Sequence, residues 1–197
     1  MDGLRGGGCE DCGMQQEAGP AGSARSRLGR RALILLPAMA FVALLAFGLL
    51  RSGSAPEIGD PAPEFTAERL VGGGTLALED LRGRPVVLNF WASWCGPCED
   101  EGPMLKSAHE RFGDRVHFVG VDIRDARGDA LEFVERYGLD YEHVRDERLE
   151  IYNDYGLTGQ PETFLIDEDG RIAQHISGPF FSEDDLFGLL EGLLASG

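Results

Sequence analysis

The stretch WASWCGPCEDEGP, residues 91–103, decides how the rest of this chain is interpreted. It follows VVLNFW at 86–91, a continuous apolar run rich in β-branched and aromatic residues, which is typical of a buried strand. Two cysteines three residues apart then begin a segment, Cys95–Phe112, whose pattern predicts a helix that is bent or interrupted at Pro103. The stretch therefore predicts a strand, a short loop, and cysteines at the start of a helix.

This placement gives the two cysteines a specific chemistry. At a helix N-terminus, free backbone N–H groups and the helix dipole stabilise a thiolate, so Cys95 is expected to be reactive near neutral pH. Cys98 lies one turn later on the same face, within reach of a disulfide. Pro97, which follows Gly96, suits an early helical position. We expect thiol–disulfide exchange, in which Cys95 attacks and Cys98 resolves the mixed disulfide.

A zinc half-site and an inert structural disulfide are the alternative interpretations of the pair. Zinc would need two further ligands. The other cysteines, Cys9 and Cys12, lie near the N-terminus. The histidines are scattered without ligand spacing, at positions 109, 117, 143 and 175. The sequence therefore predicts no metal site and no cofactor other than the redox-active disulfide.

The charge of the chain is unevenly distributed. Residues 1–51 carry six Arg against four acidic residues, whereas residues 52–197 carry 12 Lys and Arg against 30 Asp and Glu, a net charge of −18. So acidic a segment would repel a phosphate backbone, which excludes a nucleic-acid-binding role. The acidity serves solubility or favours basic partners.

The N-terminal part predicts a membrane anchor. Residues 1–31 are rich in Gly, Ser and Arg and are expected to be a disordered tail. Residues 32–50 are 19 residues without a charge, and a helix of this length just spans a hydrocarbon core of about 30 Å. Arginines precede this span, so the positive-inside rule predicts a cytoplasmic N-terminus and an extracytoplasmic domain at 58–197, joined by a linker at 51–57. A cleaved signal peptide, the alternative, would have a shorter apolar core.

The rest of the chain predicts an α/β domain, because strand-like and helix-like segments alternate along it. Phe65–Arg69 and Thr75–Leu78 flank three glycines and predict a hairpin. Further strands are expected at 116–121, 141–144, 163–166 and 171–177, and further helices at 129–137, 149–155 and 183–195.

Several motifs together resemble the thioredoxin fold, in particular its membrane-anchored, extracytoplasmic branch that includes the TlpA, ResA and DsbE/CcmG thiol–disulfide oxidoreductases. The motifs are WCGPC after VVLNFWAS, GDPAPEF at 59–65, the CxxCxxExP pattern completed by Glu101 and Pro103, the added helix and strand at 129–144, and GQPETFLIDEDG at 159–170. The resemblance covers residues 57–197. It implies a thioredoxin fold with an N-terminal β-hairpin and an inserted helix–strand, preceded by one transmembrane helix.

The resemblance also implies site residues. Pro161 is similar to the family's cis-proline facing the cysteine pair, where Gln160 replaces a residue that is often small or β-branched. Glu101 resembles the family's active-site acid, and Glu162 matches a second acid of the DsbE branch. Asn89 stands where thioredoxin has a buried acid. Trp94 is expected to contact substrates, and the whole predicted substrate-contacting set is Trp94, Gly96, Pro97, Gln160 and Glu162.

The cysteine motif and the compartment favour a reductant. A Gly-Pro centre is similar to that of thioredoxin, with a potential of about −270 mV, rather than that of an oxidant such as DsbA at about −120 mV. The family's usual substrate is the CxxCH disulfide of apocytochrome c, and its usual electron donor is a CcdA/DsbD-like membrane protein. The resemblance therefore implies a role in cytochrome c biogenesis.

Three alternatives remain. One is reduction of a copper-site cysteine pair during oxidase assembly, and another is a copper chaperone without turnover. The third is a peroxiredoxin, an antioxidant enzyme, because GDPAPEF also opens that family. Peroxiredoxins, however, need Thr or Ser at the position of Ala92.

Overall fold

The computed structural model describes residues 55–195 and positions 37, 39, 41 and 42, which are helical. The chain divides into two compact units, Met1–Arg51 and Ser52–Gly197. The predicted tail, most of the predicted anchor at 32–50 and the start of the linker lie outside the described residues. Within the described residues, no helix combines the length and the apolar character that crossing a membrane requires.

The second unit is built on a five-stranded mixed sheet in the order β5-β4-β3-β6-β7. Its strands are β3 (Val86–Trp91), β4 (His117–Ile123), β5 (Glu142–Asp146), β6 (Glu162–Ile166) and β7 (Ile172–Ser177). β3, β4 and β5 run parallel, whereas β6 and β7 are antiparallel to their neighbours. All six residues of central β3 are buried, as expected for a strand covered on both faces.

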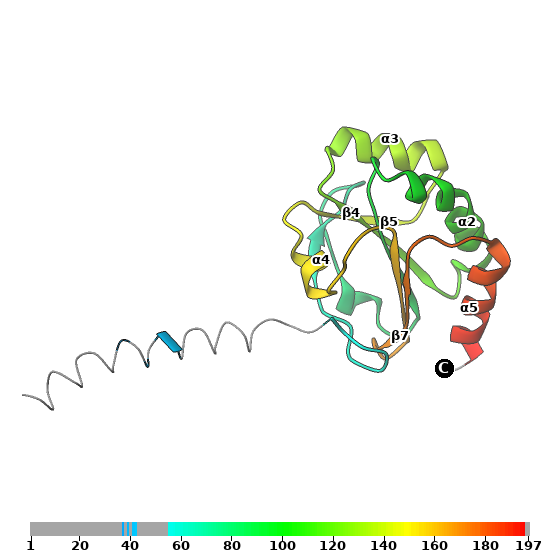
Figure 1. Cartoon of the computed structure of the whole chain (residues 1–197). Coiled ribbons are helices and arrows are strands. Elements are labelled where there is room, and N and C mark those ends of the chain that lie inside the picture. Colours follow the sequence, from blue (N-terminus) through cyan, green and yellow to red (C-terminus); the bar gives the residue numbers. More distant parts are fainter. Residues whose placement is uncertain (1–36, 38, 40, 43–54, 196–197) are drawn as a thin grey trace, which may run out of the picture. The chain divides into compact units, whose positions relative to one another are not determined.

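Two hydrophobic clusters cover the two faces of the sheet. Val87 packs with residues of α2 (Gly96–Phe112) and α5 (Glu183–Ala195) on one face. Its neighbour Leu88 points to the opposite face, because side chains alternate along a strand. There it packs with residues of η1 (Leu78–Leu81) and α4 (Glu150–Asp154). Figure 1 shows α2 and α5 on one side of the sheet and α4 on the other.

The predicted N-terminal hairpin is present as β1 (Thr66–Glu68) and β2 (Thr75–Ala77). Its turn holds three glycines, Gly72–Gly74, whose φ angles of 80°, 75° and 76° fall in the left-handed region that favours glycine. A β-bridge between Arg69 and Val144 joins the hairpin to β5 at the edge of the main sheet. The hairpin thereby becomes part of the same folded unit.

The predicted inserted helix and strand are α3 (Arg127–Tyr137) and β5. The insertion contributes to a third cluster, which also contains both cysteines of the CGPC motif. In this cluster the Phe133 ring stacks on the Trp91 ring, with centroids 4.6 Å apart. The insertion therefore supports the end of β3 from which the cysteine loop departs.

The expected thioredoxin-like α/β fold is confirmed, with small differences at element boundaries. α2 begins after Cys95, which is its N-cap, and runs without interruption through Pro103. Pro103 lies on the exposed face, where water can bond to the carbonyl that the proline leaves without its helical donor. β5 extends to Asp146, two residues beyond the predicted end, because its pairing with β4 continues to Ile123.

Candidate active site

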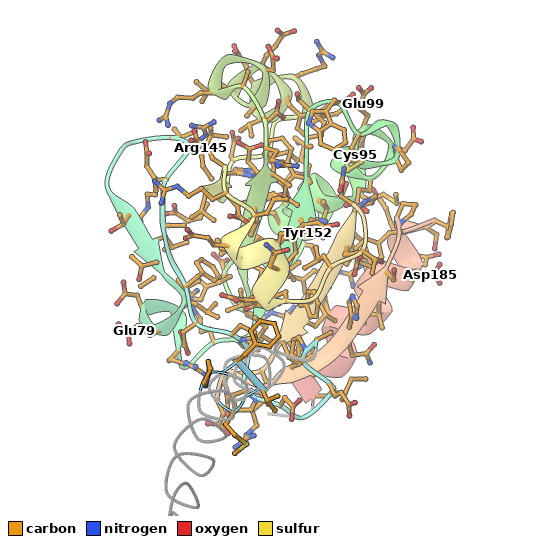
Figure 2. The ribbon with its side chains drawn as sticks, turned by 60° about the vertical axis from the view of Figure 1, so that its left-hand side comes forward. Glu79, Cys95, Glu99, Arg145, Tyr152 and Asp185 are labelled. Carbon is orange, nitrogen blue, oxygen red and sulfur yellow. A yellow bond between two sulfur atoms is a disulfide. The ribbon has the colours of Figure 1, made fainter. Side chains whose placement is uncertain are left out.

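The cysteine pair lies where β3 ends and α2 begins (Figure 2). Cys95 and Cys98 form a disulfide. As the N-cap of α2, Cys95 accepts a hydrogen bond at its sulfur from the Cys98 backbone N–H, at 3.2 Å. The Cys95 and Cys98 side chains are largely buried, at 5% and 2% exposure. In the reduced protein the same N–H group and the helix dipole would stabilise a Cys95 thiolate.

The two tryptophans of the WASW sequence differ in their environment. Trp91 is 2% exposed and packs in the core against Phe133. Trp94, next to Cys95, is 59% exposed. Gly96 and Pro97 are exposed as well. Trp94, Gly96 and Pro97 therefore form an open surface beside the disulfide. Trp91 lies in the core, at the start of the loop that leads to Cys95.

Glu101 lies on α2, one turn after Cys98, and is 1% exposed. Its carboxylate accepts a hydrogen bond from Asn89 Nδ2 at 2.7 Å and from the Phe180 backbone N–H at 3.3 Å. Burial raises the pKa of Glu101 from 4.5 to about 7, and these two hydrogen bonds oppose the rise. Asn89 also donates to Thr163 Oγ1 at 3.0 Å. The position that carries an acid in thioredoxin thus holds the amide that anchors Glu101.

The loop before β6 contains the Gln160–Pro161 peptide bond, which is cis. Pro161 is buried and its carbonyl accepts a hydrogen bond from the Gly178 backbone N–H at 3.0 Å. Gln160 is half-buried. The residues after Gly178 reach Glu101 through the Phe180 N–H. One segment, residues 178–180, therefore contacts both the cis-proline loop and the buried acid of α2.

Glu162 lies on the face of the sheet opposite to Glu101. Its register partner is Phe90, whereas the side chain that holds Glu101 comes from Asn89, which points the other way. The Glu162 carboxylate is 3% exposed and accepts hydrogen bonds from residues 158 and 159 and from His175. Glu162 thus braces the loop that carries the cis proline, rather than pairing with Glu101.

Asp125 is a site residue that the sequence analysis did not single out. Its carboxylate accepts a hydrogen bond from the Ser93 backbone N–H at 2.6 Å and from Ser93 Oγ at 2.9 Å. It therefore fixes the loop that leads into Cys95. Arg145 donates to the Asp125 carbonyl at 2.9 Å. The only signal in the sequence is that Asp125 follows β4, at the edge where parallel strands place their functional loops.

Asp122 is a second buried acid near this loop. It is 1% exposed and pairs in register with Trp91, the last residue of β3. Burial raises the pKa of Asp122 from 3.8 to about 7; the Asp125 carboxylate adds to the rise and Arg145 opposes it. The nearest cation is Arg145 Nε at 3.5 Å. The end of β4 therefore carries a carboxyl that can be neutral near pH 7.

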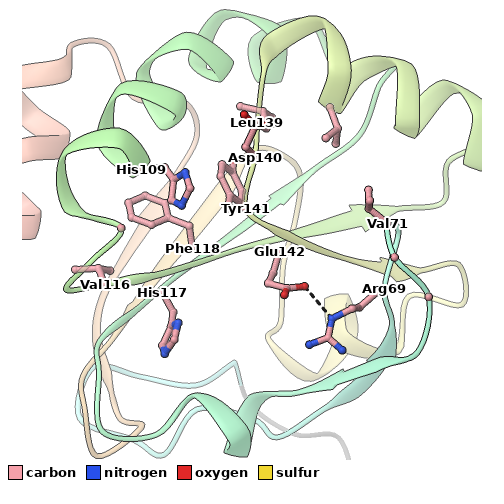
Figure 3. A pocket seen from close by; sticks show the side chains of 14 residues that line it. Arg69, Val71, His109, Val116, His117, Phe118, Leu139, Asp140, Tyr141 and Glu142 are labelled. Carbon is pink, nitrogen blue, oxygen red and sulfur yellow. Dashed lines mark hydrogen bonds and ion pairs between the residues drawn. The ribbon is translucent and has the colours of Figure 1, made fainter.

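An open pocket of about 840 Å³ lies away from the disulfide. Figure 3 shows that its lining residues include His109, Phe118 and Tyr141. Neither cysteine lines it, and a thiol–disulfide reaction requires an accessible sulfur rather than an enclosed cavity. We therefore assign the chemistry to the surface around the cysteine pair. No group of three His, Cys, Asp or Glu side chains in the described part of the chain is arranged to hold a metal ion.

Comparisons with known proteins agree with this geometry. Residues 58–175 match the AhpC/TSA family. The chain is 33% identical over 162 residues to the thiol-disulfide oxidoreductase ResA of Geobacillus thermodenitrificans, covering 81% of this chain and 92% of the relative. It is 38% identical over 144 residues to the thiol:disulfide interchange protein DsbE of Xylella fastidiosa, covering 70% and 72%.

A solved structure shows the same fold. The crystal structure of a secreted Mycobacterium tuberculosis disulfide oxidoreductase homologous to E. coli DsbE superposes with a TM-score of 0.61 at 31% identity, covering 66% of this chain and 96% of that one. The family match, the relatives and the cysteine pair agree. The chain belongs to the AhpC/TSA family and is a thioredoxin-like thiol–disulfide oxidoreductase of the ResA and DsbE type, with Cys95 and Cys98 as its cysteine pair.

Proposed function

We propose that this protein is a membrane-anchored, extracytoplasmic reductant of apocytochrome c, acting on the CxxCH disulfide before haem is attached. The observation that carries the proposal is the pairing of a helix-capping Cys95 with a buried acid one turn after Cys98. The substrate class follows from the resemblance to the ResA and DsbE branch, and the relatives named thiol-disulfide oxidoreductase and thiol:disulfide interchange protein support the reaction type. The apolar segment at 32–50 and the arginines that precede it support the location.

The reaction begins with the reduced pair. The Cys95 thiolate attacks one sulfur of the substrate disulfide, which forms a Cys95–substrate disulfide and releases the second substrate sulfur as a thiolate that takes up a proton. Cys98 then loses its proton and attacks the Cys95 sulfur. This step forms the Cys95–Cys98 disulfide and releases the first substrate sulfur as a thiol. The substrate gains two electrons from the cysteine pair and two protons, one of which comes from Cys98 and the other from water.

Glu101 is the group we propose to move the proton of Cys98. Residues three apart on a helix lie on the same face, which places this carboxyl on the Cys98 side of α2. A pKa of about 7 lets Glu101 accept and release a proton near neutral pH. Its burial also protects that proton from bulk water while a substrate covers the site.

The electrons are proposed to come from a CcdA/DsbD-like membrane protein, because an extracytoplasmic compartment is oxidising and does not regenerate thiols by itself. A general reductase there would work against the oxidases. The surface around Trp94 and the cis-proline loop is proposed to restrict the reductant to its own substrates.

A substrate trap tests the proposal. Cys98→Ser in the full-length protein, expressed in its native host, should leave Cys95 joined to its substrate, and Cys95→Ser is the matched control. Apocytochromes c caught through their CxxCH cysteines would support the proposal. Copper-site proteins would move the assignment to oxidase assembly, and a broad mixture would refute a narrow specificity.

The direction of electron flow is tested separately by equilibration with a dithiol buffer of known potential. A potential near the thioredoxin value of about −270 mV agrees with a reductant. A potential near the DsbA value of about −120 mV would identify an oxidant instead.

A further inference from the structure

A buried carboxylate, that of Glu162, holds the part of the loop that precedes the cis proline. Glu162 Oε1 accepts hydrogen bonds from the backbone N–H groups of Thr158 and Gly159, at 3.0 and 3.1 Å, and from Thr158 Oγ1 at 3.4 Å. These donors lie two and one residues before Gln160. The Gln160–Pro161 segment is therefore held on one side by this side chain and on the other by the backbone hydrogen bond from Gly178 to Pro161.

The second oxygen of that carboxylate has a different partner. Glu162 Oε2 pairs with His175 Nε2 at 2.6 Å, across the antiparallel pair β6–β7. In this register His175 lies opposite Phe164, so it is the diagonal neighbour of Glu162 on the same face. The two oxygens of Glu162 therefore have separate partners. Oε1 binds the backbone of the loop, and Oε2 binds His175.

The His175 ring is itself fixed in place. It stacks flat on the Phe164 ring, with centroids 4.1 Å apart and an interplanar angle of 6°. Phe164 is completely buried in the core cluster on the face of the sheet that η1 and α4 cover. The His175 side chain is 34% exposed, so the ring lies at the border between core and solvent. The core therefore sets the direction in which His175 Nε2 points.

We propose that His175 is a positioning residue for substrate binding: by fixing Glu162 it fixes the Gln160–Pro161 segment against which an incoming polypeptide lies. This inference deepens the proposed function, because it concerns how the same site receives a protein disulfide. His175 touches neither cysteine and takes no part in the exchange of sulfur bonds. Its loss would weaken polypeptide binding and leave the chemistry of the cysteine pair unchanged.

Two substitutions separate the hydrogen bond from the stacking. His175→Phe keeps a flat ring over Phe164 and removes the donor to Glu162. His175→Gln removes the ring and keeps an N–H donor that can reach the carboxylate. His117→Phe is the matched control: His117 begins β4 and pairs with Val86, at the end of the sheet opposite to the disulfide. Thermal unfolding of each oxidised variant checks that it is folded.

The assay uses the full chain in non-ionic detergent, with Cys9→Ser and Cys12→Ser in every variant so that the reduced Cys95–Cys98 pair supplies all of its thiols. Single-turnover oxidation is followed with a closed CxxCH disulfide peptide, a closed CxxC peptide without the histidine, and 5,5′-dithiobis(2-nitrobenzoic acid) as a small disulfide. We expect His175→Phe to raise the half-saturating concentration of both peptides about tenfold, the equivalent of about 1.4 kcal/mol. The maximal rate, the rate with the small disulfide and the reduction potential should stay within about twofold of wild type.

The variants give outcomes that decide between the explanations. His175→Gln should recover most of the peptide binding, and His117→Phe should behave like wild type. The inference would be overturned if His175→Phe slowed the reaction with the small disulfide as much as with the peptides, or if it changed the reduction potential. It would also be overturned if His175→Phe bound the peptides as tightly as wild type. A wild-type protein that prefers the CxxC peptide to the CxxCH peptide would count against the proposed function alone. The contact between His175 and Glu162 acts on the backbone of the loop. It therefore predicts the same ratio of half-saturating concentrations, His175→Phe over wild type, for both peptides.

Discussion

Replacing Glu101 with Gln changes one property of the buried site more than any other, its ability to ionise. The two side chains have nearly the same shape, and an amide oxygen can still accept the hydrogen bond from Asn89. The amide nitrogen would face the Phe180 N–H, so the weaker bond at 3.3 Å is lost. That loss costs about 1 kcal/mol at every pH. The pH dependence, by contrast, comes from the carboxyl alone.

The magnitude follows from the raised pKa. The carboxyl has a pKa of 4.5 in the unfolded chain and of about 7 in the folded one, so the folded state holds its proton more tightly. Stability from this group is fully present below pH 4.5 and is lost as the pH rises through about 7. One pKa unit equals about 1.4 kcal/mol, so the total is about 3.5 kcal/mol, of which about 3 kcal/mol is lost between pH 4.5 and 8.

The assay is guanidinium unfolding of the oxidised full chain in non-ionic detergent at pH 4.5, 6, 7 and 8, followed by tryptophan fluorescence. The free energy of unfolding of Glu101→Gln, relative to wild type, should rise by about 3 kcal/mol between pH 4.5 and 8. Asp122 titrates in both proteins and cancels in this difference. Asp100→Asn removes an exposed carboxylate of the same helix and controls for the loss of one negative charge.

Parallel stability curves for wild type and Glu101→Gln would refute the reasoning, since they would mean that the carboxyl titrates alike in the folded and unfolded states. The proposed proton transfer also predicts a change in a reaction rate. Release of a trapped substrate by Cys98 should slow in Glu101→Gln above pH 7, where the wild-type carboxylate is ionised and can accept the proton.

Three further changes test the site from other directions. Trp94→Ala should leave the unfolding free energy within about 0.5 kcal/mol and weaken peptide binding, whereas Trp91→Ala should cost about 3–5 kcal/mol by guanidinium unfolding. Gly120→Ala should destabilise by about 1–3 kcal/mol in the same assay, because its Cβ would lie 2.3 Å from His143 Nδ1 and 2.6 Å from Trp91 Nε1. Asp125→Asn should cost about 1–3 kcal/mol and speed proteolysis of the loop ahead of the cysteine pair, and a protease-resistant variant would contradict the bracing role.

Local sequence patterns predicted most of the fold. The apolar run of β3, the N-terminal hairpin and the inserted α3 and β5 all occur within a few residues of their expected positions. These elements follow from periodicity, glycine placement and cap chemistry, which depend on neighbours in the chain. The N-terminal anchor stays a prediction, since it lies almost wholly outside the described residues.

The partners of the buried acids could not be predicted in this way. Glu162 meets His175 because β6 and β7 pair in one register, and a shift of one residue would turn the histidine to the other face. Asp125 meets Ser93 across 32 positions, through the parallel pairing of β3 and β4. Such contacts depend on register and loop length, which a single sequence leaves open.

The exchange of an acid for an amide at Asn89 has a physical consequence for the cysteine pair. An acid on β3 would stand in the central strand, and two carboxylates sharing this pocket could not both ionise. With an amide on β3 and the carboxyl on α2, the strand donates a hydrogen bond that favours the ionised form of Glu101, while burial opposes it. The balance holds the pKa near 7, and it places the titrating group on the helix that carries both cysteines. An acid on the helix rather than on the strand therefore keeps a fixed position relative to Cys98, one turn earlier in α2.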